Sequence, residues 1–595
     1  MAKWFVAAKR ADFDKIASDF GISPVLARII RNRDIVEERD ISMFLNGTLE
    51  DLYDPFLMKD MDLGTGIIQE KIRQQKKIRI IGDYDIDGVC ATYILLKGLR
   101  LAGADVDAAI PHRMKDGYGI NENLIREAQE VGVDTIITCD NGIAARDAIS
   151  VAKDLGMTVI ITDHHEIPYE ESETEEHGRQ RRYLLPPADA VINPHQEDCA
   201  YPFQGICGAA VAYKFILALH SQMSGLSASE NQELLGFAAF ATIGDVMELR
   251  DENRIMVRYG LRYLTETTNH GMRALIEANG LNEMPLTVYH VGFILGPCLN
   301  ATGRLDTARR ALELFLTESM RESKMAASEL KEMNDSRKQM TVDGLQKAIE
   351  MAESGDYQND RVLVIYLPAL HESLAGIIAG RLRERYGKPS FVLTDGEDMV
   401  KGSGRSIEAY HMYENLCQVQ ELLHKFGGHK LAAGLSLLQS NVETFRQRLN
   451  ESCELTKEDM IEKVSIDVPM PVRYATMPFI KELEKLEPFG MGNPKPLFAH
   501  KNIVLLRGKV LGKDKNVLKI TVSDEEGQQR EAIFFGDTGL FERDMDTRYG
   551  NGAFERFLSG GNGQCRMHIV YYPDINEFRG NRSIQIVIKH YQFPE

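Results

Sequence analysis

The sequence lacks the features of a membrane protein, a secreted protein or a zinc-binding protein. It has no run of about 18 apolar residues, which a membrane-spanning helix requires. Residues 1–10 contain no apolar stretch followed by a small-residue cleavage site. The eight cysteines are scattered without a Cys-x-x-Cys pair, which indicates reduced thiols and not a disulfide framework or a structural zinc site. We therefore expect a cytoplasmic, monomeric protein that does not bind membranes.

Positive charge is also scarce. Lys and Arg total 70 against 88 Asp and Glu, so the formal net charge is −18. This balance excludes a protein that coats nucleic acid by bulk charge. It does not exclude a nuclease, because bound cations reverse the sign of an acidic site and basic residues can line a single groove.

The 595 residues exceed what one hydrophobic core can hold and predict about three or four domains. After residue 63, short apolar segments alternate with helical patterns. The strand candidates are 78–81, 135–138 and 158–161, and the helix candidates are 90–101, 121–129 and 144–155. Strands separated by helices predict an α/β domain with a parallel sheet, whose ligands lie beyond the carboxyl ends of the strands.

The remaining patterns divide the chain further. We predict an N-terminal helical segment at 1–62, a catalytic domain at 63–320, a connecting helix at 321–355, a smaller α/β domain at 356–455 and a β-barrel of the OB type at 456–595. The charged insert 169–183 is predicted to be a solvated loop. The glycine-rich segments 401–406 and 426–429 are predicted to be turns, and 550–563 a loop of the barrel.

Acidic residues follow the first predicted strand. Asp83, Asp85 and Asp87 occupy alternate positions, and in extended backbone Asp85 and Asp87 point the same way. Carboxylates that meet repel each other unless a cation lies between them. Alone, this motif is equally explained by acids that cap the following helix.

Two further strand ends repeat the signal. The second strand ends at Asp140, and the third runs into Asp163-His164-His165, where Asp163 could orient an imidazole from behind. Asp245 ends an apolar, helix-like run, where it either caps the helix or faces a cation.

Carboxylates with imidazoles favour Mn²⁺ or Mg²⁺. Such a set can hold two ions about 4 Å apart, the arrangement of phosphodiester hydrolysis. The sequence therefore predicts a two-metal hydrolase.

The smaller α/β domain carries candidate phosphate contacts. Ser403, Arg405 and Ser406 place hydroxyls and a guanidinium on a glycine-rich backbone, and His429 follows a second Gly-Gly pair. Each segment taken alone is as well explained by an ordinary turn.

Together these motifs resemble the DHH phosphoesterase superfamily, and their order over nearly the whole chain resembles its RecJ family. Further similar stretches include Pro111-His112-Arg113 and Asn300-Ala301-Thr302-Gly303-Arg304. The resemblance implies an Mn²⁺- or Mg²⁺-dependent exonuclease that degrades single-stranded DNA from the 5′ end in repair and recombination. It also implies single-strand-binding protein and a helicase as partners.

The resemblance assigns roles to individual residues. It implies metal ligation by Asp85, Asp87, Asp140, His164 and Asp245. We further expect Asp83 and Asp163 to lie behind these ligands. The resemblance also implies that His165 lies beside the scissile phosphate and that Arg113, Ser403 and Arg405 contact phosphate. Arg304, Ser406 and His429 are our own further candidates for substrate contacts. The chain departs from the family at Cys298, where an Arg is frequent, and Arg304 and Arg337 are candidates to compensate.

We hypothesise that Asp140 bridges two ions and that His165 donates to a non-bridging phosphate oxygen. The barrel aromatics Phe534, Phe535, Tyr571 and Phe578 either stack on bases or fill the barrel core. Two other functions stay open: an oligoribonuclease or nucleotide phosphoesterase of the same superfamily, and a non-catalytic nucleic-acid-binding scaffold.

Overall fold

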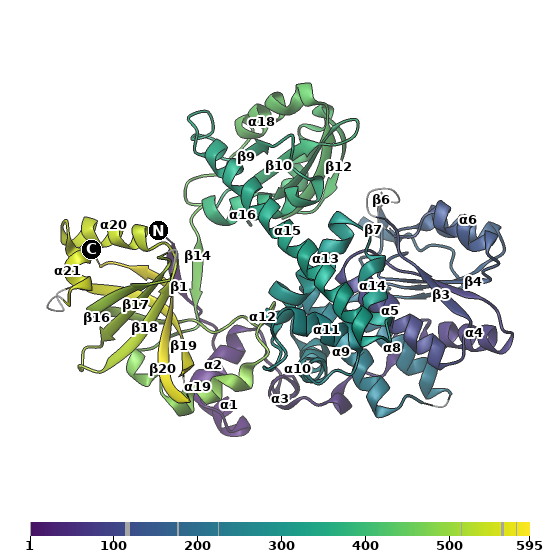
Figure 1. Ribbon diagram of the computed structural model, residues 1–595, viewed down its shortest axis with the longest axis horizontal. Coiled ribbons are helices and arrows are strands. Elements are labelled where there is room, and N and C mark those ends of the chain that lie inside the picture. Colours follow the sequence, from purple (N-terminus) through teal and green to yellow (C-terminus); the bar gives the residue numbers. More distant parts are fainter. Residues whose placement is uncertain are drawn as a thin grey trace.

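Figure 1 shows three bodies around the centre of the molecule: a large α/β domain, a smaller α/β lobe and a β-barrel. The structure, a computed structural model, describes residues 2–112, 119–174, 178–223, 225–512, 515–560, 565–578 and 580–594. Within these ranges, every helix is too short or too polar to cross a lipid bilayer.

The large domain is built on a parallel sheet. Its strand order is β3 (Val106–Ala109), β2 (Ile78–Ile81), β4 (Thr135–Cys139), β5 (Thr158–Thr162) and β8 (Ala190–Ile192). The three predicted strands are confirmed as β2, β4 and β5. The edge strands β3 and β8 were not predicted, because β3 has only four residues, including a charged Asp107, and β8 has only three.

The topology brings distant segments to one edge of this sheet. The chain passes from β2 to β3 on one side and then to β4 on the other, so the strand order reverses between β2 and β4. Ligands of such sheets bind at this reversal, beyond the carboxyl ends of the strands. Three helices with long buried apolar stretches pack beside that edge: α5 (Ile86–Leu101), α8 (Gly208–Ser221) and α9 (Ala228–Gly244). Helices that are apolar on all sides belong in a core.

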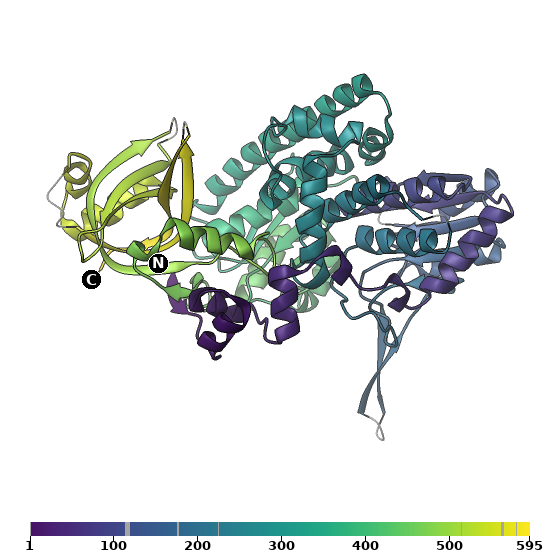
Figure 2. The same ribbon diagram turned by 90° about the horizontal axis from the view of Figure 1, so that it is seen from below.

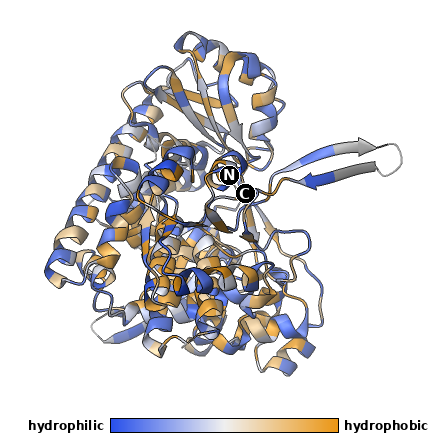
Figure 3. Ribbon diagram, turned by 90° about the vertical axis from the view of Figure 1, so that its right-hand side faces the viewer, coloured by the Kyte–Doolittle hydropathy of each residue, from blue (hydrophilic) through white to orange (hydrophobic). Residues whose placement is uncertain are grey.

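The insert 169–183 is a hairpin, so the prediction of a loop was wrong. β6 (Tyr169–Thr174) and β7 (Gly178–Tyr183) pair antiparallel and project from the body of the domain (Figures 2 and 3). The Arg181 guanidinium lies 4.5 Å from the Tyr169 ring centroid and 3.3 Å from a Glu171 oxygen. Cross-strand pairs of this kind stabilise a ladder without an apolar face, which is why apolar periodicity did not reveal it.

A long helix joins the large domain to the smaller lobe, as predicted. α15 (Met320–Ala352) buries Ala327 and Leu330 against the large domain and Ala348 against the lobe. The sheet of the lobe has the order β12 (Leu423–Gly428), β13 (Ala432–Leu437), β11 (Val400–Arg405), β10 (Ser390–Asp395) and β9 (Leu363–Tyr366), with α16 (Ala375–Tyr386) packed on it. The glycine-rich segments predicted as turns are therefore mainly strands, β11 and β12.

Five C-terminal strands pair in a ring, which agrees with the predicted OB-type barrel. The ring runs β16 (Phe498–Leu511), β17 (Val517–Ser523), β18 (Gln529–Phe535), β20 (Asn581–Gln592), β19 (Arg566–Phe578) and back to β16. Helices α20 (Thr538–Tyr549) and α21 (Ala553–Leu558) lie between β18 and β19. The segment 550–563 therefore contains a helix, where only a loop was predicted.

The N-terminal segment packs on the barrel. β1 (Lys3–Val6), which was not predicted, pairs in parallel with β14 (Lys463–Ile466). Helices α1 (Phe13–Phe20) and α2 (Pro24–Asn32) contribute to the core that the barrel strands share. The Arg33 guanidinium donates to the Asn493 side chain at 2.8 Å and to Asp467 at 3.1 Å, so the two ends of the chain form one unit.

Candidate active site

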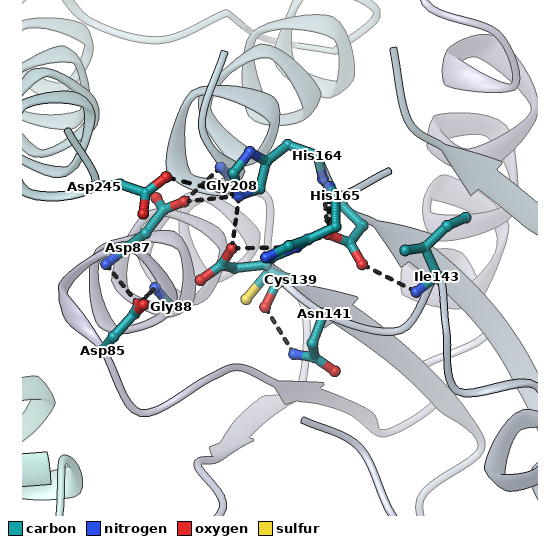
Figure 4. Close-up of polar contacts among 12 residues, drawn as sticks. Asp85, Asp87, Gly88, Cys139, Asn141, Ile143, His164, His165, Gly208 and Asp245 are labelled. Atoms are coloured by element: carbon teal, nitrogen blue, oxygen red, sulfur yellow. Dashed lines mark hydrogen bonds and ion pairs between the residues drawn. The ribbon is translucent and has the colours of Figure 1, made fainter. Parts of the chain in front are cut away.

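The strand-end residues predicted to bind metal meet at one point of the large domain (Figure 4). The His164 Nε2 atom lies 3.1 Å from an Asp140 oxygen, 3.6 Å from Asp87 and 3.9 Å from Asp245. These residues follow β5, β4 and β2 and end α9, so four segments far apart in the sequence supply one cluster. The structure thus brings together the side chains that the sequence only placed at separate strand ends.

Asp85 has the helix-capping role that the sequence left open. Its carboxylate accepts hydrogen bonds of 3.0 Å from the backbone N–H groups of Asp87 and Gly88 at the start of α5. Burial and the nearby charge of Asp87 raise the pKa of Asp85. A cap of this kind fixes one oxygen and leaves the carboxylate turned toward the cluster, so capping and metal binding are compatible.

Asp87 is held by the beginning of another helix. Its two oxygens accept hydrogen bonds from the backbone N–H groups of Gly208 at 2.6 Å and Ala209 at 2.8 Å. The N-terminus of α8 therefore stabilises this fully buried carboxylate through its free N–H groups and its dipole. Glycine is required at position 208, because a Cβ there would lie 2.7 Å from the Asp140 Cβ.

Asp140 occupies the centre of the cluster in a strained backbone conformation. Its φ of 59° lies in the left-handed region, which costs free energy for a residue with a side chain. Burial, followed by the charges of Asp87 and Asp85, raises the pKa of Asp140 well above its ordinary value. Strain and buried charge at one residue are typical of functional sites, where the surrounding fold maintains them.

The adjacent histidines have different surroundings. Burial lowers the pKa of His164, which favours the neutral imidazole that binds metals. Burial alone would also lower the pKa of His165. The hydrogen bond to Asp163 and the Asp163 charge outweigh this effect, and they raise the pKa of His165 to about 9. The Asp163 carboxylate lies 2.8 Å from His165 Nδ1 and accepts N–H bonds from His164 and Ile143. Asp163 therefore orients both residues, as expected for a group behind the cluster.

Asp245 closes the cluster from the end of α9. Burial, followed by the charges of Asp87 and Asp85, raises its pKa to about 8. Asp83 is buried beside Asp85 and Asp140, and burial followed by the Asp85 charge raises its pKa to about 7. One Asp83 carboxylate oxygen is buried without a hydrogen-bond partner in the described part of the chain. So many buried carboxylates in one place are stable only with compensating positive charge.

The donor set fits divalent cations. Among the residues that the structure describes, three groups have ligand atoms within 4.8 Å of one another: Asp140, His164 and His165; Asp87, His164 and Asp245; and Asp83, Asp85 and Asp140. Asp140 belongs to two of the groups, and the donors are oxygens and imidazole nitrogens without cysteine. This chemistry suits Mn²⁺ or Mg²⁺ and has room for more than one ion.

The candidate phosphate contacts of the smaller lobe are placed less uniformly. Ser403 lines a pocket of about 490 Å³ with Lys401 and Lys425, and Arg405 packs against the start of α16 near Gly376. The Ser406 hydroxyl is buried and donates to the Tyr410 carbonyl at 2.7 Å, so it does not reach that pocket.

His429 is exposed and shares a second pocket, of about 930 Å³, with His165 and Asp163. This pocket joins the two lobes beside the cluster. Arg304 donates to the Ser373 carbonyl at 2.7 Å, which ties α13 (Gly296–Leu305) to the smaller lobe. Arg113 lies outside the described residues.

Cys298, where a family Arg was expected, is buried in α13 beneath α15. Its Sγ lies 3.4 Å from the Asn334 side chain, whose oxygen accepts hydrogen bonds of 3.1 and 3.0 Å from Arg337. The guanidinium of Arg337 therefore lies close to Cys298, where an Arg of the family would supply a positive charge.

Sequence reasoning missed residues that shape the cluster through the backbone. The Asn141 side chain donates to the carbonyls of Ile81 and Cys139, which joins β2 to β4 at their carboxyl ends. The Asn300 side chain accepts from the backbone N–H of Ile86 at 3.1 Å, directly between Asp85 and Asp87. Both lie in motifs that resembled the family, but only long-range contacts reveal what they do.

Comparison with known proteins gives matches along most of the chain. Residues 77–242 match the DHH family N-terminal domain, residues 359–455 the DHHA1 domain and residues 466–590 the RecJ OB domain. The single-stranded-DNA-specific exonuclease RecJ of Bacillus subtilis is 35% identical over 98% of this chain and 70% of its own length. That of Escherichia coli is 30% identical over 98% of both chains.

Solved structures agree. The crystal structure of RecJ in complex with Mn²⁺ from Thermus thermophilus has a TM-score of 0.81 at 25% identity and covers 100% of this chain and 80% of that one. A crystal structure of exonuclease RecJ bound to manganese has a TM-score of 0.57 at 30% identity, covering 68% of this chain and 96% of that one.

Proposed function

The chain belongs to the RecJ family of single-stranded-DNA-specific exonucleases, and we propose that it removes nucleotides from the 5′ end of single-stranded DNA with two divalent ions. The single observation that carries the proposal is the convergence of Asp85, Asp87, Asp140, His164 and Asp245 on one buried point. A non-catalytic scaffold would not need to keep a complete set of buried, mutually repelling carboxylates.

The residues of the cluster have different proposed roles in hydrolysis. Ions held there would supply Lewis acidity and lower the pKa of an attacking water. Asp140, at the centre, is the best placed carboxylate to contact two ions. His165 uses Nδ1 for Asp163, which leaves Nε2 for a non-bridging oxygen of the scissile phosphate. A donor fixed in advance stabilises charge that develops in the transition state.

The smaller lobe supports a choice of strand end. Ser403 and Arg405 lie on β11 and offer a hydroxyl and a forked guanidinium, groups that bind a terminal phosphate. Arg304 and His429 stand where the lobes meet, and Arg304 fixes their relative position through Ser373. A 5′ phosphate held by Ser403 and Arg405 would place the first phosphodiester of the strand at the metal-binding cluster.

Digestion of 5′- and 3′-labelled single strands, as DNA and as RNA, with Mn²⁺ or Mg²⁺ tests the proposal. We expect mononucleotide release from the 5′ label of DNA, with duplex ends resistant. Release from the 3′ label first would overturn the polarity. Turnover of dinucleotides or RNA in preference to long DNA would favour the oligoribonuclease alternative.

The wider role is part of the same proposal. Single-strand-binding protein and a helicase are the partners that such an enzyme needs when its substrate is made from duplex DNA during repair and recombination. We also propose the domain boundaries predicted from the sequence, a cytoplasmic location and a monomeric enzyme.

A further inference from the structure

Two aromatic rings are exposed side by side on the large domain. Tyr289, in α12 (Val288–His290), and Phe293, in the π-helical turn η3 (Val291–Leu295), are 60% and 66% exposed. Their ring centroids lie 5.1 Å apart at an interplanar angle of 25°. Phe293 has the largest exposed fraction among the large apolar side chains that the structure describes. Exposed aromatic area is unfavourable in water and commonly marks a binding surface.

The backbone maintains this exposure. The turn η3 buries Val291 and Leu295 and leaves Phe293 on the outer side. Tyr289 and Phe293 are four positions apart, so they lie on the same face of this helical segment and can stack. The segment Val291–Leu295 forms a π-helical turn. Such turns are rare and occur frequently at functional sites.

One end of the ring pair adjoins the metal-binding cluster. A Cβ at Gly292 would lie 3.8 Å from Ile243, which is two residues before Asp245 in α9. The turn η3 therefore packs against the end of α9 that carries Asp245. Val246, directly after Asp245, is 64% exposed.

The other end adjoins the segment that leads into the barrel. A Cβ at Gly490 would lie 3.5 Å from Val288, and the Met491 carbonyl accepts a 2.8 Å hydrogen bond from the Leu249 N–H. Met491 is itself 56% exposed. Figure 1 places α12 on the side of the large domain that faces the barrel. The rings therefore lie between the cluster and the domain that matches the RecJ OB domain.

We propose that Tyr289 and Phe293 form a stacking platform for bases of the single-stranded DNA substrate, between the catalytic cluster and the barrel. The proposal rests on the function proposed above. Bases stack on aromatic rings whatever their sequence, which suits an exonuclease that must accept every nucleotide.

The charges beside Tyr289 favour a nucleic-acid strand as the occupant. A pocket of about 760 Å³ next to Tyr289 is lined by both cations and acids. The cations are Arg258, Arg262, Lys485 and Lys495, and the acids are Glu266, Glu484 and Glu487. Cations near a flat aromatic surface offer phosphate contacts next to base stacking, whereas the whole chain is acidic.

Fluorescence of 2-aminopurine placed at successive positions of a 5′-phosphorylated DNA strand tests the platform. Binding is measured with EDTA, so that no hydrolysis occurs. We expect quenching at an internal position in the wild type, and its loss in the Tyr289→Ala/Phe293→Ala variant. Binding of a long strand should weaken about 10- to 100-fold, as expected when one or two stacked bases are lost. Dinucleotide binding should not change.

Two controls separate stacking from folding. Tyr289→Phe and Phe293→Tyr keep aromatic faces and should keep the quenching. Phe5→Ala removes a ring that is 48% exposed on β1 and should change nothing.

The inference is overturned if the double variant quenches and binds long strands like the wild type. It is also overturned if the rings instead mediate self-association, seen as a sedimentation change in the variant. A wild-type protein that binds strands but hydrolyses none would contradict the proposed function. The quenching experiment would still test the stacking platform, because it does not depend on hydrolysis.

Discussion

The large domain and the smaller lobe both present polar groups from an α/β sheet, but they bury them to different depths. In the large domain, Asp87, Asp140 and Asp163 are at most 2% exposed and are held by backbone N–H groups or imidazoles. In the lobe, Ser403 and Arg405 are only half-buried and His429 is exposed. A buried charge must keep its partners, whereas a half-exposed group contributes only the contacts that it makes with a ligand.

Because of this difference, we expect substitutions in the large domain to abolish activity and substitutions in the lobe to weaken it by smaller steps. Asp140→Ala removes the carboxylate shared by two of the ligand groups. We expect kcat to fall by at least about 1,000-fold, comparable to the loss of a principal electrostatic group, with strand binding retained. Asp154→Asn, at the exposed end of α7 (Arg146–Asp154), is the matched control. More than a tenth of wild-type activity in the Asp140 variant would contradict the assignment.

Arg405→Ala should act on binding and not on chemistry. We expect KM for 5′-phosphorylated strands to rise about 10- to 100-fold with little change in kcat, since one charge-assisted contact contributes about 1.5–3 kcal/mol. Strands with a 5′ hydroxyl should be less affected. Arg448→Ala, an exposed Arg of α18 (Val442–Glu451) that pairs with Glu421, controls for loss of charge. Equal effects on both kinds of strand would show that Arg405 does not read the end.

The Asp245→Asn variant tests the buried cluster by its effect on thermal stability, with and without metal. Because the pKa of Asp245 is raised to about 8, its carboxyl must take up a proton when the metal-free protein folds at neutral pH, which costs free energy. Asn carries no such cost, so the metal-free variant should melt at a higher temperature than wild type. Mn²⁺ should stabilise the wild type by about 2.7 kcal/mol at 100 times its Kd and stabilise the variant less. Scanning calorimetry with and without EDTA measures both shifts. A variant that melts lower without metal and responds fully to Mn²⁺ would contradict the electrostatic account.

Ser406→Ala should have the smallest effect. Its hydroxyl is engaged with the Tyr410 carbonyl, so we expect activity to change less than about twofold, while stability falls by about 1 kcal/mol. Ser403→Ala, from the same motif but in the pocket, should raise KM more. A larger kinetic effect at Ser406 than at Ser403 would reverse the assignment within the lobe.

The sequence predicted the centre of the large domain well because its signals are local. β2, β4 and β5 are short apolar runs that end in acids or histidines, and a parallel sheet aligns their carboxyl ends. That Asp87 binds the start of α8, or that Asn300 supports Ile86, depends on contacts between positions more than a hundred residues apart. No local pattern encodes such contacts.

Glycine explains why the lobe was predicted less well. Gly402 and Gly404 suggested a turn, yet they lie within β11. A Cβ at Gly402 would lie 2.3 Å from a Leu393 methyl, and one at Gly404 would lie 2.5 Å from the Met412 sulfur. Glycine is therefore present for close packing and not for a turn, and without side chains the strand shows no alternating pattern.

For the aromatic residues of the barrel, too, the sequence did not predict which side chains are buried and which are exposed. Phe534 and Tyr571 fill the core, while Phe535 is 60% exposed and the side chain of Phe578 lies outside the described residues. Stacking on bases therefore stays a prediction for Phe535. The rings of Tyr289 and Phe293 were not singled out, because exposure cannot be read from residue type.

Anomalous diffraction from crystals soaked in Mn²⁺ tests the central claim most directly. The account predicts two peaks inside the cluster, with ligands drawn from Asp85, Asp87, Asp140, His164 and Asp245 and with Asp140 touching both. Ordered manganese elsewhere, with these side chains left without metal, would contradict it.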